Sequence, residues 1–205
     1  MPVGVLEANC YFVYDDGSAG GFIVDPGGDS EEILENVAQT GASIEAVLVT
    51  HGHSDHLGAT GSVAQVANAR IYGSEEVGSV LGSPDDHLLI PGMAPFEAAA
   101  VAQTLSGGES LELAGSSIEV ISTPGHSPGS LTYHCEDGLF CGDLLFRGAV
   151  GRADLPGGSF EQLLESIKKL MEAYPPQTKV YTGHGSATTL KWEKENNPFL
   201  SGIKW

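Results

Sequence analysis

The sequence predicts a layered α/β fold in which helices cover the faces of sheets. Short apolar and β-branched runs, which are typical of strands, alternate with segments of helical periodicity. The length of 205 residues and the hydrophobic fraction of 41% fit a soluble protein with a core of its own. Because no low-complexity tract or long linker divides the chain, we expect one domain over residues 1–205.

The strand-like runs fall into two halves, one ending near Leu105 and the other beginning at Gly107-Gly108. Both halves place strands before helices, which hints at a pseudo-repeat within one domain. The expected strands are Cys10–Tyr14, Gly21–Val24, Ile44–Thr50, Ile118–Ser122, Leu131–His134, Leu139–Cys141 and Lys179–Thr182.

Helical patterns lie between and after these strands. The expected helices are Ser30–Gln39, Phe160–Ala173 and two more that begin near Leu57 and near Thr188. Asp29 and Glu32 occupy the positions of a capping box, and Pro175-Pro176 ends the second helix. The first helix is expected to bury one apolar face, made of Ile33, Leu34, Val37 and Ala38. Gly and Pro residues in the range 82–95 predict a surface loop.

The charge balance narrows the possible partners. The 9 Lys and Arg residues against 27 Asp and Glu residues give a net charge of −18, which repels phosphate backbones and anionic lipids. We therefore expect neither nucleic acid nor a membrane surface as a partner. Arg70 is the first basic residue and no apolar run reaches spanning length, which favours a cytoplasmic protein without an export signal.

The three cysteines predict no disulfide framework. Cys10, Cys135 and Cys141 include no CxxC pair, and their number is odd. Cys135 and Cys141 could face each other across a hairpin, but we expect buried, reduced thiols without a metal role.

The segment from His51 to His56 holds the densest cluster of candidate metal ligands. It reads His-Gly-His-Ser-Asp-His and directly follows the expected strand 44–50. His51 and His53, two residues apart, can converge on one ion, whereas the adjacent Asp55 and His56 must point toward a neighbouring ion. The spacing therefore predicts two metal ions.

Three more strands end in short glycine-containing turns that carry ligand-type residues. His126 follows the strand 118–122, Asp143 follows 139–141, and His184 follows 179–182. Ligand sites in α/β folds favour strand ends, so we expect these side chains to join the segment 51–56. Imidazole and carboxylate ligands suit zinc, with iron or manganese as alternatives.

Three other residues have less defined roles. Asp25, in Val-Asp-Pro-Gly at the end of a strand, either orients a ligand histidine from behind or forms an Asx turn. His87, beside two aspartates, and His134, within an expected strand, lack the context of a ligand and are expected to be structural or solvated.

These motifs resemble those of the metallo-β-lactamase superfamily and, within it, the short glyoxalase II-like hydrolases. The resemblance covers nearly the whole chain. It is carried by the HxHxDH segment 51–56, by Thr123–Ser130, by Gly142–Phe146, by Gly151–Asp154, and by the end of the chain from Gly183–Gly185 to Asn197–Phe199.

The resemblance implies an αββα sandwich, two mixed sheets flanked by helices, with the site at one edge of the sheets. It assigns His51, His53 and His126 to the first ion, Asp55, His56 and His184 to the second, and Asp143 to both as a bridge. The helical C-terminal extension that helps longer glyoxalase II enzymes hold glutathione has no counterpart in this sequence.

The expected chemistry is hydrolysis. Two divalent ions beside a shared water lower its pKa toward neutrality and so supply hydroxide, while Asp55 or Asp143 orients the attacking water. The sequence has no Gly-Xaa-Ser-Xaa-Gly elbow and no obvious general acid outside the ligand set. A thiolate leaves with little acid assistance, which favours thioesters over amides. With the resemblance, this implies a glyoxalase II-like thioesterase that hydrolyses S-(2-hydroxyacyl)glutathione, such as S-lactoylglutathione.

A glutathione conjugate is anionic, so a strongly acidic enzyme needs local cations to hold it. Candidates close in sequence to the expected ligands are Arg147, Arg152, Lys191 and Lys194. Arg152 is the first choice, because it resembles the position of a glutathione-contacting basic residue in longer glyoxalase II enzymes. Ser186 stands where those enzymes have a tyrosine, so a different thioester remains an alternative.

Other activities stay open. In a persulfide dioxygenase-like protein, His51, His126 and Asp143 would hold a single Fe(II). For β-lactam or lactone hydrolysis the sequence carries no specific signal. A noncatalytic metal-binding protein is disfavoured, because structural zinc sites are usually closed by four ligands, mostly thiolates.

Overall fold

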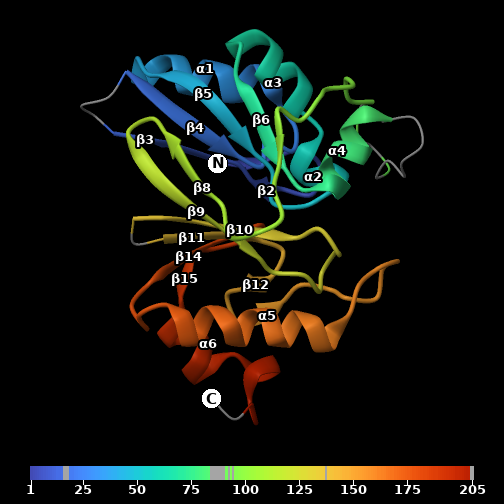
Figure 1. Cartoon of the computed structure of the whole chain (residues 1–205), viewed down its shortest axis with the longest axis vertical. Coiled ribbons are helices and arrows are strands. Elements are labelled where there is room, and N and C mark those ends of the chain that lie inside the picture. Colours follow the sequence, from blue (N-terminus) through green and yellow to red (C-terminus); the bar gives the residue numbers. More distant parts are fainter. Residues whose placement is uncertain (16–18, 84–90, 92, 94, 137, 204–205) are drawn as a thin grey trace.

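The structure is a computed structural model that describes residues 1–15, 19–83, 91, 93, 95–136 and 138–203. Two mixed β-sheets pack face to face between outer layers of helices, as Figure 1 shows. The αββα architecture expected from the sequence is therefore confirmed. Among the described residues, no helix has the length and apolar character needed to cross a membrane.

The first sheet is built from the first half of the chain. Its strands are β3 (Tyr11–Tyr14), β4 (Gly20–Val24), β5 (Ser43–Leu48), β6 (Arg70–Gly73) and β7 (Gln103–Thr104), in this spatial order. The β3/β4 pair is antiparallel and the others are parallel. A small hairpin precedes it, formed by β1 (Pro2–Val3) and β2 (Ala8–Asn9).

The second sheet is built from the second half. Its strands are β8 (Ser110–Leu113), β9 (Ser116–Ser122), β10 (Leu131–Cys135), β11 (Gly138–Gly142), β14 (Lys179–Thr182) and β15 (Thr188–Thr189). Their spatial order is β15-β14-β11-β10-β9-β8, parallel only between β11 and β14. A hairpin of β12 (Leu145–Phe146) and β13 (Ala149–Val150) follows β11 in sequence.

Helices cover the outer face of each sheet. The helices α1 (Ser30–Thr40) and α3 (Thr60–Ala67) lie on the first sheet, while α5 (Phe160–Ala173) and α6 (Leu190–Asn196) lie on the second (Figure 1). The other helical elements are α2 (Ser54–Leu57), α4 (Glu75–Gly82) and a 3₁₀ turn at Pro198–Leu200.

Each sheet buries both faces, because side chains alternate along its strands. The layer between the sheets includes Phe22, Leu48, Ile118, Val120, Tyr133 and Phe140. The layer under the first helices includes Ile23, Val47, Ile33, Val37 and Val63. The layer under α5 includes Leu139, Val180, Leu163, Ile167 and Leu170. This packing holds the loops at one edge of both sheets in fixed positions.

Two details of the first helix differ from the prediction. Asp29 has a left-handed backbone with φ of 51°, and its Oδ2 accepts a hydrogen bond from the Gly4 amide at 2.7 Å instead of capping α1. That carboxylate therefore ties the β1–β2 hairpin to the helix start. Ala38 is exposed, because the buried stripe of α1 runs through Ile33 and Val37.

The region after β6 was predicted incompletely. The helix α4 was not expected, because Gly78 and Gly82 weaken its helical pattern, but Ser74 caps it by accepting a hydrogen bond from Val77 N. The expected loop over 82–95 begins at the last residue of α4, and most of it lies outside the described residues. His87 lies outside them as well.

Candidate metal centre

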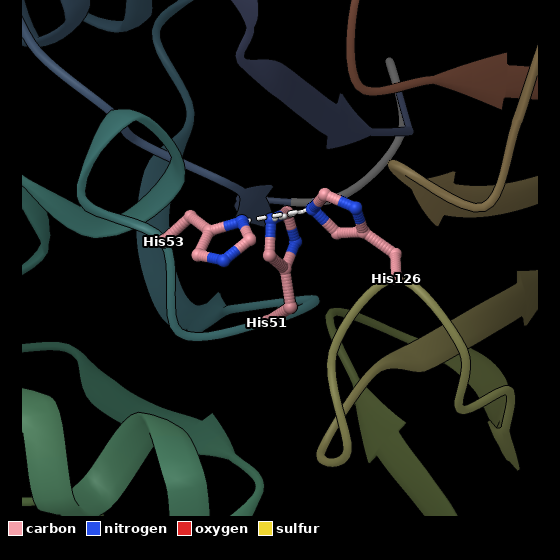
Figure 2. Close-up of side chains that lie close together, drawn as sticks. All are labelled: His51, His53 and His126. Carbon is pink, nitrogen blue, oxygen red and sulfur yellow. Dashed lines mark hydrogen bonds between the residues drawn. The ribbon is translucent and has the colours of Figure 1, made fainter. Parts of the chain in front are cut away.

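The loop after β5 brings His51 and His53 to His126, which lies in the turn between β9 and β10. The Nε2 atom of His126 lies 3.2 Å from His51 Nε2 and 2.8 Å from His53 Nδ1. Figure 2 shows the three rings, carried by two separate loops, turned toward one another. One nitrogen of each ring therefore faces a common point, and we call these residues the first ligand set.

A second cluster lies beside the first. Asp55 and His56 come from the short helix α2, and His184 follows β14. His184 Nε2 lies 3.3 Å from Asp55 Oδ2 and 3.3 Å from His56 Nε2. These three residues form the second ligand set, which combines one carboxylate with two imidazoles.

Asp143, which follows β11, lies between the two sets. Its Oδ2 is 3.6 Å from His126 Nε2 and 3.7 Å from His184 Nε2, so one oxygen faces a ring of each set. Its Oδ1 lies 3.2 Å from His56 Nε2 but is buried without a hydrogen-bond partner among the described residues. A buried carboxylate oxygen that accepts no hydrogen bond is costly unless a positive charge lies beside it, and a bound cation would supply that charge.

The backbone just before Asp143 is irregular. The parallel ladder between β11 and β14 is in register up to Phe140 and then skips Cys141, so that Gly142 pairs with Thr182. Gly142 has a φ of +49°, and a Cβ atom there would overlap the Thr50 hydroxyl. Such bulges redirect the side chain that follows, and only glycine fits this close approach. The bulge therefore positions Asp143 over the ligand rings.

Asp25 supports both sets from behind. Its Oδ2 lies 2.9 Å from His56 Nδ1 and accepts a hydrogen bond from Thr50 Oγ1 at 2.7 Å, while its Oδ1 accepts one from the Thr50 amide. Thr50 Oγ1 also lies 3.0 Å from His51 Nδ1. With Nδ1 as the donor, each of these two rings presents Nε2 to the centre, as metal-bound imidazoles typically do when an oxygen behind the ring accepts the Nδ1 proton.

A backbone carbonyl plays the same part for His126. Its Nδ1 lies 2.7 Å from the carbonyl oxygen of Arg152, which leaves Nε2 to face the other rings. Neither this carbonyl nor the Thr50 hydroxyl was predicted from the sequence. A threonine directly before the HxH segment indicates such a supporting contact only weakly, and the sequence does not indicate which main-chain carbonyl will face a ligand ring.

The pKa shifts of the first set favour neutral rings. Burial lowers the pKa of His51 well below its ordinary value, and the nearby His56 and His126 rings lower it further. Burial and then His126 lower the pKa of His53 in the same direction. Neutral imidazole is the form that ligates a metal ion, so this set is prepared to bind one.

Carboxylates reverse the direction in the second set. Burial opposes a charge on His56, but Asp143 and then Asp25 raise its pKa well above the ordinary value. The hydrogen bond to Asp55 raises the pKa of His184. Burial likewise opposes the charge of Asp143, yet His56 above all lowers the pKa of this carboxyl to about 2.

The spacing of these atoms suits a metal pair. Tetrahedral zinc with bonds of about 2.0–2.1 Å separates its ligand nitrogens by about 3.3 Å. The first set shows 2.8 and 3.2 Å, and the two rings of the second set show 3.3 Å. Together with the unpartnered oxygen of Asp143, these distances show that the His and Asp groups fit metal binding. Zinc, iron and manganese are all compatible with such ligands.

The cations expected to bind substrate lie in different surroundings. Arg152 donates from Nε and Nη2 to Asp154 at 2.8 and 2.9 Å, and its side chain is 61% exposed. The guanidinium of Arg147 lies 4.3 Å from the ring centre of Trp192 and has no carboxylate partner among the described residues. Lys191 pairs at 4.0 Å with the glutamate one turn later on α6.

The remaining reactive side chains lie outside the centre. All three cysteines are free and buried, as expected, and burial raises the pKa of Cys10 and Cys141 to about 12, which keeps their thiols protonated and unreactive. His134 lies in β10, 3.6 Å from Glu119 and against the ring of Tyr174.

Comparisons with known proteins agree with this geometry. The sequence profile of the Metallo-beta-lactamase superfamily matches residues 3–184. The probable metallo-hydrolase YqgX of Bacillus subtilis (strain 168) is 36% identical, over 99% of this chain and 97% of YqgX. The hydroxyacylglutathione hydrolase GloC of Haemophilus influenzae is 34% identical, over 98% of this chain and 96% of GloC.

Solved structures give the same result. The BLEG-1 B3 metallo-beta-lactamase superposes with a TM-score of 0.91 at 35% identity, over 98% of both chains. TTHA1623 in a di-iron-bound form gives 0.81 at 35% identity, again over 98% of both chains. ETHE1 from Myxococcus xanthus gives 0.77 at 26% identity, over 97% of this chain and 82% of that one. From its sequence, its fold and these matches, the chain belongs to the metallo-beta-lactamase superfamily.

Proposed function

We propose that this chain is a thioesterase with two divalent ions, whose substrate is an S-(2-hydroxyacyl)glutathione such as S-lactoylglutathione. The observation that carries the proposal is the position of Asp143, which has one oxygen between the two ligand sets and a second, buried oxygen without a hydrogen-bond partner in the described part of the chain. A single carboxylate in that position suits a pair of ions and not one isolated ion.

The two ligand sets and Asp143 would hold the ions. When bound, such ions supply an activated water and a Lewis acid for the substrate carbonyl. The Asp25 carboxylate, through His56 and Thr50, keeps ligand rings in the tautomer that presents Nε2. Asp55 and Asp143, both with lowered pKa, remain charged acceptors that can orient an attacking water.

The leaving group favours a thioester. A departing thiolate needs little proton donation, since a free thiol has a pKa of about 8.5, whereas a departing amine needs a general acid. The buried cysteines offer no alternative nucleophile, because their thiols stay protonated. Similarity to GloC, named a hydroxyacylglutathione hydrolase, supports the same substrate class.

Arg147 and Arg152 are the proposed contacts to the carboxylates of glutathione, with Lys191 as a further candidate. We prefer Arg147 to Arg152 as the main contact, because the Arg152 guanidinium already binds Asp154 through two hydrogen bonds. Arg147 follows Phe146, whose ring centre lies 6.0 Å from that of His184. Its stacking on Trp192 fixes an exposed cation one residue after this ring contact.

The test combines metal analysis with three substrates. We expect about two ions per chain, and hydrolysis of S-lactoylglutathione that is lost on chelation and restored by zinc, iron or manganese. A small thioester without the glutathione carboxylates should react with a higher KM. A β-lactam is the third substrate, because BLEG-1 is named a metallo-beta-lactamase. Turnover of the β-lactam without turnover of either thioester would contradict the proposal.

The second candidate is a mononuclear Fe(II) oxidoreductase of the persulfide dioxygenase type, in which His51, His126 and Asp143 would hold the single ion. The position of the His126 ring suits this one-ion site as well as the two-ion site, because His126 Nε2 lies 3.2 Å from His51 Nε2 and 3.6 Å from Asp143 Oδ2. One tightly held iron per chain, oxygen uptake with glutathione persulfide and an active Asp55→Ala variant would replace the hydrolase by this activity.

A further inference from the structure

Glu76, in the first turn of α4, contacts the turn that carries His126. One carboxylate oxygen, Oε2, accepts a hydrogen bond from Ser127 Oγ at 2.6 Å and a second from the Gly129 amide at 2.9 Å. Ser127 and Gly129 are the next residue and the third residue after His126. Bonds to an ionised acceptor are stronger than neutral ones, so this half-buried carboxylate fixes the turn directly behind a ligand.

The same side chain lies against the loop of the other two ligands of the first set. A Cβ atom on Gly52, which separates His51 from His53, would lie 2.9 Å from Glu76 Cγ and 3.3 Å from Glu76 Oε1. The loop therefore packs closely against the Glu76 side chain at Gly52, where a larger residue would force that side chain to shift. Glu76 thus hydrogen-bonds to one of the two loops that build the first ligand set and packs against the other.

These two loops belong to different sheets. The loop of Gly52 follows β5 of the first sheet, and the turn of His126 joins β9 to β10 of the second. Where two elements from different layers meet, packing alone leaves their spacing free to vary by fractions of an ångström. Metal ligands need tighter control, which supporting hydrogen bonds supply.

We propose that Glu76 is a positioning residue that sets the spacing of the first ligand set by joining the His126 turn to the His51–His53 loop. The inference rests on the ligand assignment of the proposed function but not on its substrate. Glu76 does not touch the second ligand set in any contact of the described residues, so its influence is selective for one ion.

The test measures affinity for zinc with a competing chelator, in two backgrounds that isolate each set. The His184→Ala variant keeps the first set, and the His53→Ala variant keeps the second. In the first background we expect Glu76→Ala to weaken zinc binding by about 10–100-fold, the range for residues that support ligands. In the second background it should change the affinity by less than about threefold.

Two further variants separate positioning from general stability. Glu76→Gln keeps an acceptor oxygen but loses the charge, so it should recover part of the affinity lost in Glu76→Ala. Glu75→Ala removes the exposed neighbouring carboxylate from the same helix turn and should leave both affinities unchanged. Equal losses in both backgrounds, or no loss in the first, would overturn the proposal. Because zinc binding is measured without substrate, a failure of thioester hydrolysis would leave this result intact and would count against the proposed function alone.

Discussion

The first and second ligand sets differ in the charge that their surroundings impose. In the first set, burial lowers the pKa of His51 and His53, and no carboxylate belongs to the set. In the second set, Asp55 and Asp143 raise the pKa of His184 and His56. His51 and His53 of the first set therefore favour the neutral form. In the second set, before an ion binds, charged carboxylates lie beside imidazoles that favour the protonated form.

The difference in charge predicts which of the two sets binds its ion more tightly. A neutral site binds a cation without first losing a proton, whereas the second set must release the proton of His56 before Nε2 can act as a ligand. We expect the first set to hold the more tightly bound ion. We expect substrate and water to exchange at the second set, which carries the carboxylate Asp55.

Replacing Asp143 should have the largest effect, because one of its oxygens faces a ring of each set. In Asp143→Ala, we expect kcat to fall by more than about a hundredfold, the upper limit for residues that act from behind a ligand, while KM changes little. Steady-state kinetics and metal analysis of the same preparation measure both effects. Near-native turnover with two bound ions would show that the carboxylate does not join the sets.

Replacing Asp25 should weaken metal binding more at the second set than at the first. In Asp25→Asn, the amide nitrogen cannot accept the Nδ1 proton of His56, so the ring is driven to the tautomer that carries its proton on Nε2. We expect zinc binding by the second set to weaken by about 10–100-fold, with a smaller loss at the first set, which Asp25 reaches only through Thr50. The His53→Ala and His184→Ala backgrounds measure the two losses separately. Equal losses would mean that Asp25 supports the whole centre and not mainly His56.

Many residues of both ligand sets could be predicted from the sequence. The HxHxDH segment and the three later strand ends carry ligand types in contexts that depend only on local spacing and strand order. Strand runs on either side of Gly107-Gly108 indicated two halves, and the family resemblance implied that the strands form two sheets. These features are predictable because hydrophobic periodicity fixes each strand, and a packed pair of sheets then brings their ends together.

The contacts that distinguish the two sets were not accessible. Asp25 could be given two roles from sequence, and only the distance to His56 shows which group it faces. The helix α4 was missed because of its glycines, and with it Glu76. The Arg152 carbonyl is a main-chain acceptor, so no side-chain pattern could indicate it. Such contacts depend on how separate loops pack in space, and this packing cannot be predicted from the residue pattern of a single sequence.

The pH dependence of metal binding should reveal the difference in charge. Below the raised pKa of His56, a proton competes with the second ion, so its affinity should fall about tenfold for each unit of pH. The lowered pKa of His51 and His53 makes proton competition weaker at the first set. Dialysis against zinc between about pH 8 and about pH 6 should therefore remove one ion before the other, and zinc addition near neutral pH should release a proton with the second ion. Loss of both ions together would contradict the assignment.

The smallest effect is expected at the surface, at the two arginines. Arg147 follows Phe146, whose ring centre lies 6.0 Å from that of His184 of the second set. Arg152 contributes its carbonyl to His126 of the first set and has its guanidinium occupied by Asp154. If glutathione lies over the second set, Arg147→Ala removes one exposed charge-assisted contact remote from the reacting carbonyl. The KM for S-lactoylglutathione should then rise about tenfold with kcat nearly unchanged, since such a contact is worth about 1.5 kcal/mol at its lower end. Arg152→Ala serves as the matched control and should raise KM by less than about threefold, because its exposed guanidinium is already bound to Asp154 through two hydrogen bonds. A small thioester without glutathione carboxylates should not respond to either change. The reverse order, with Arg152→Ala the more harmful on the glutathione substrate alone, would place the substrate over the first set.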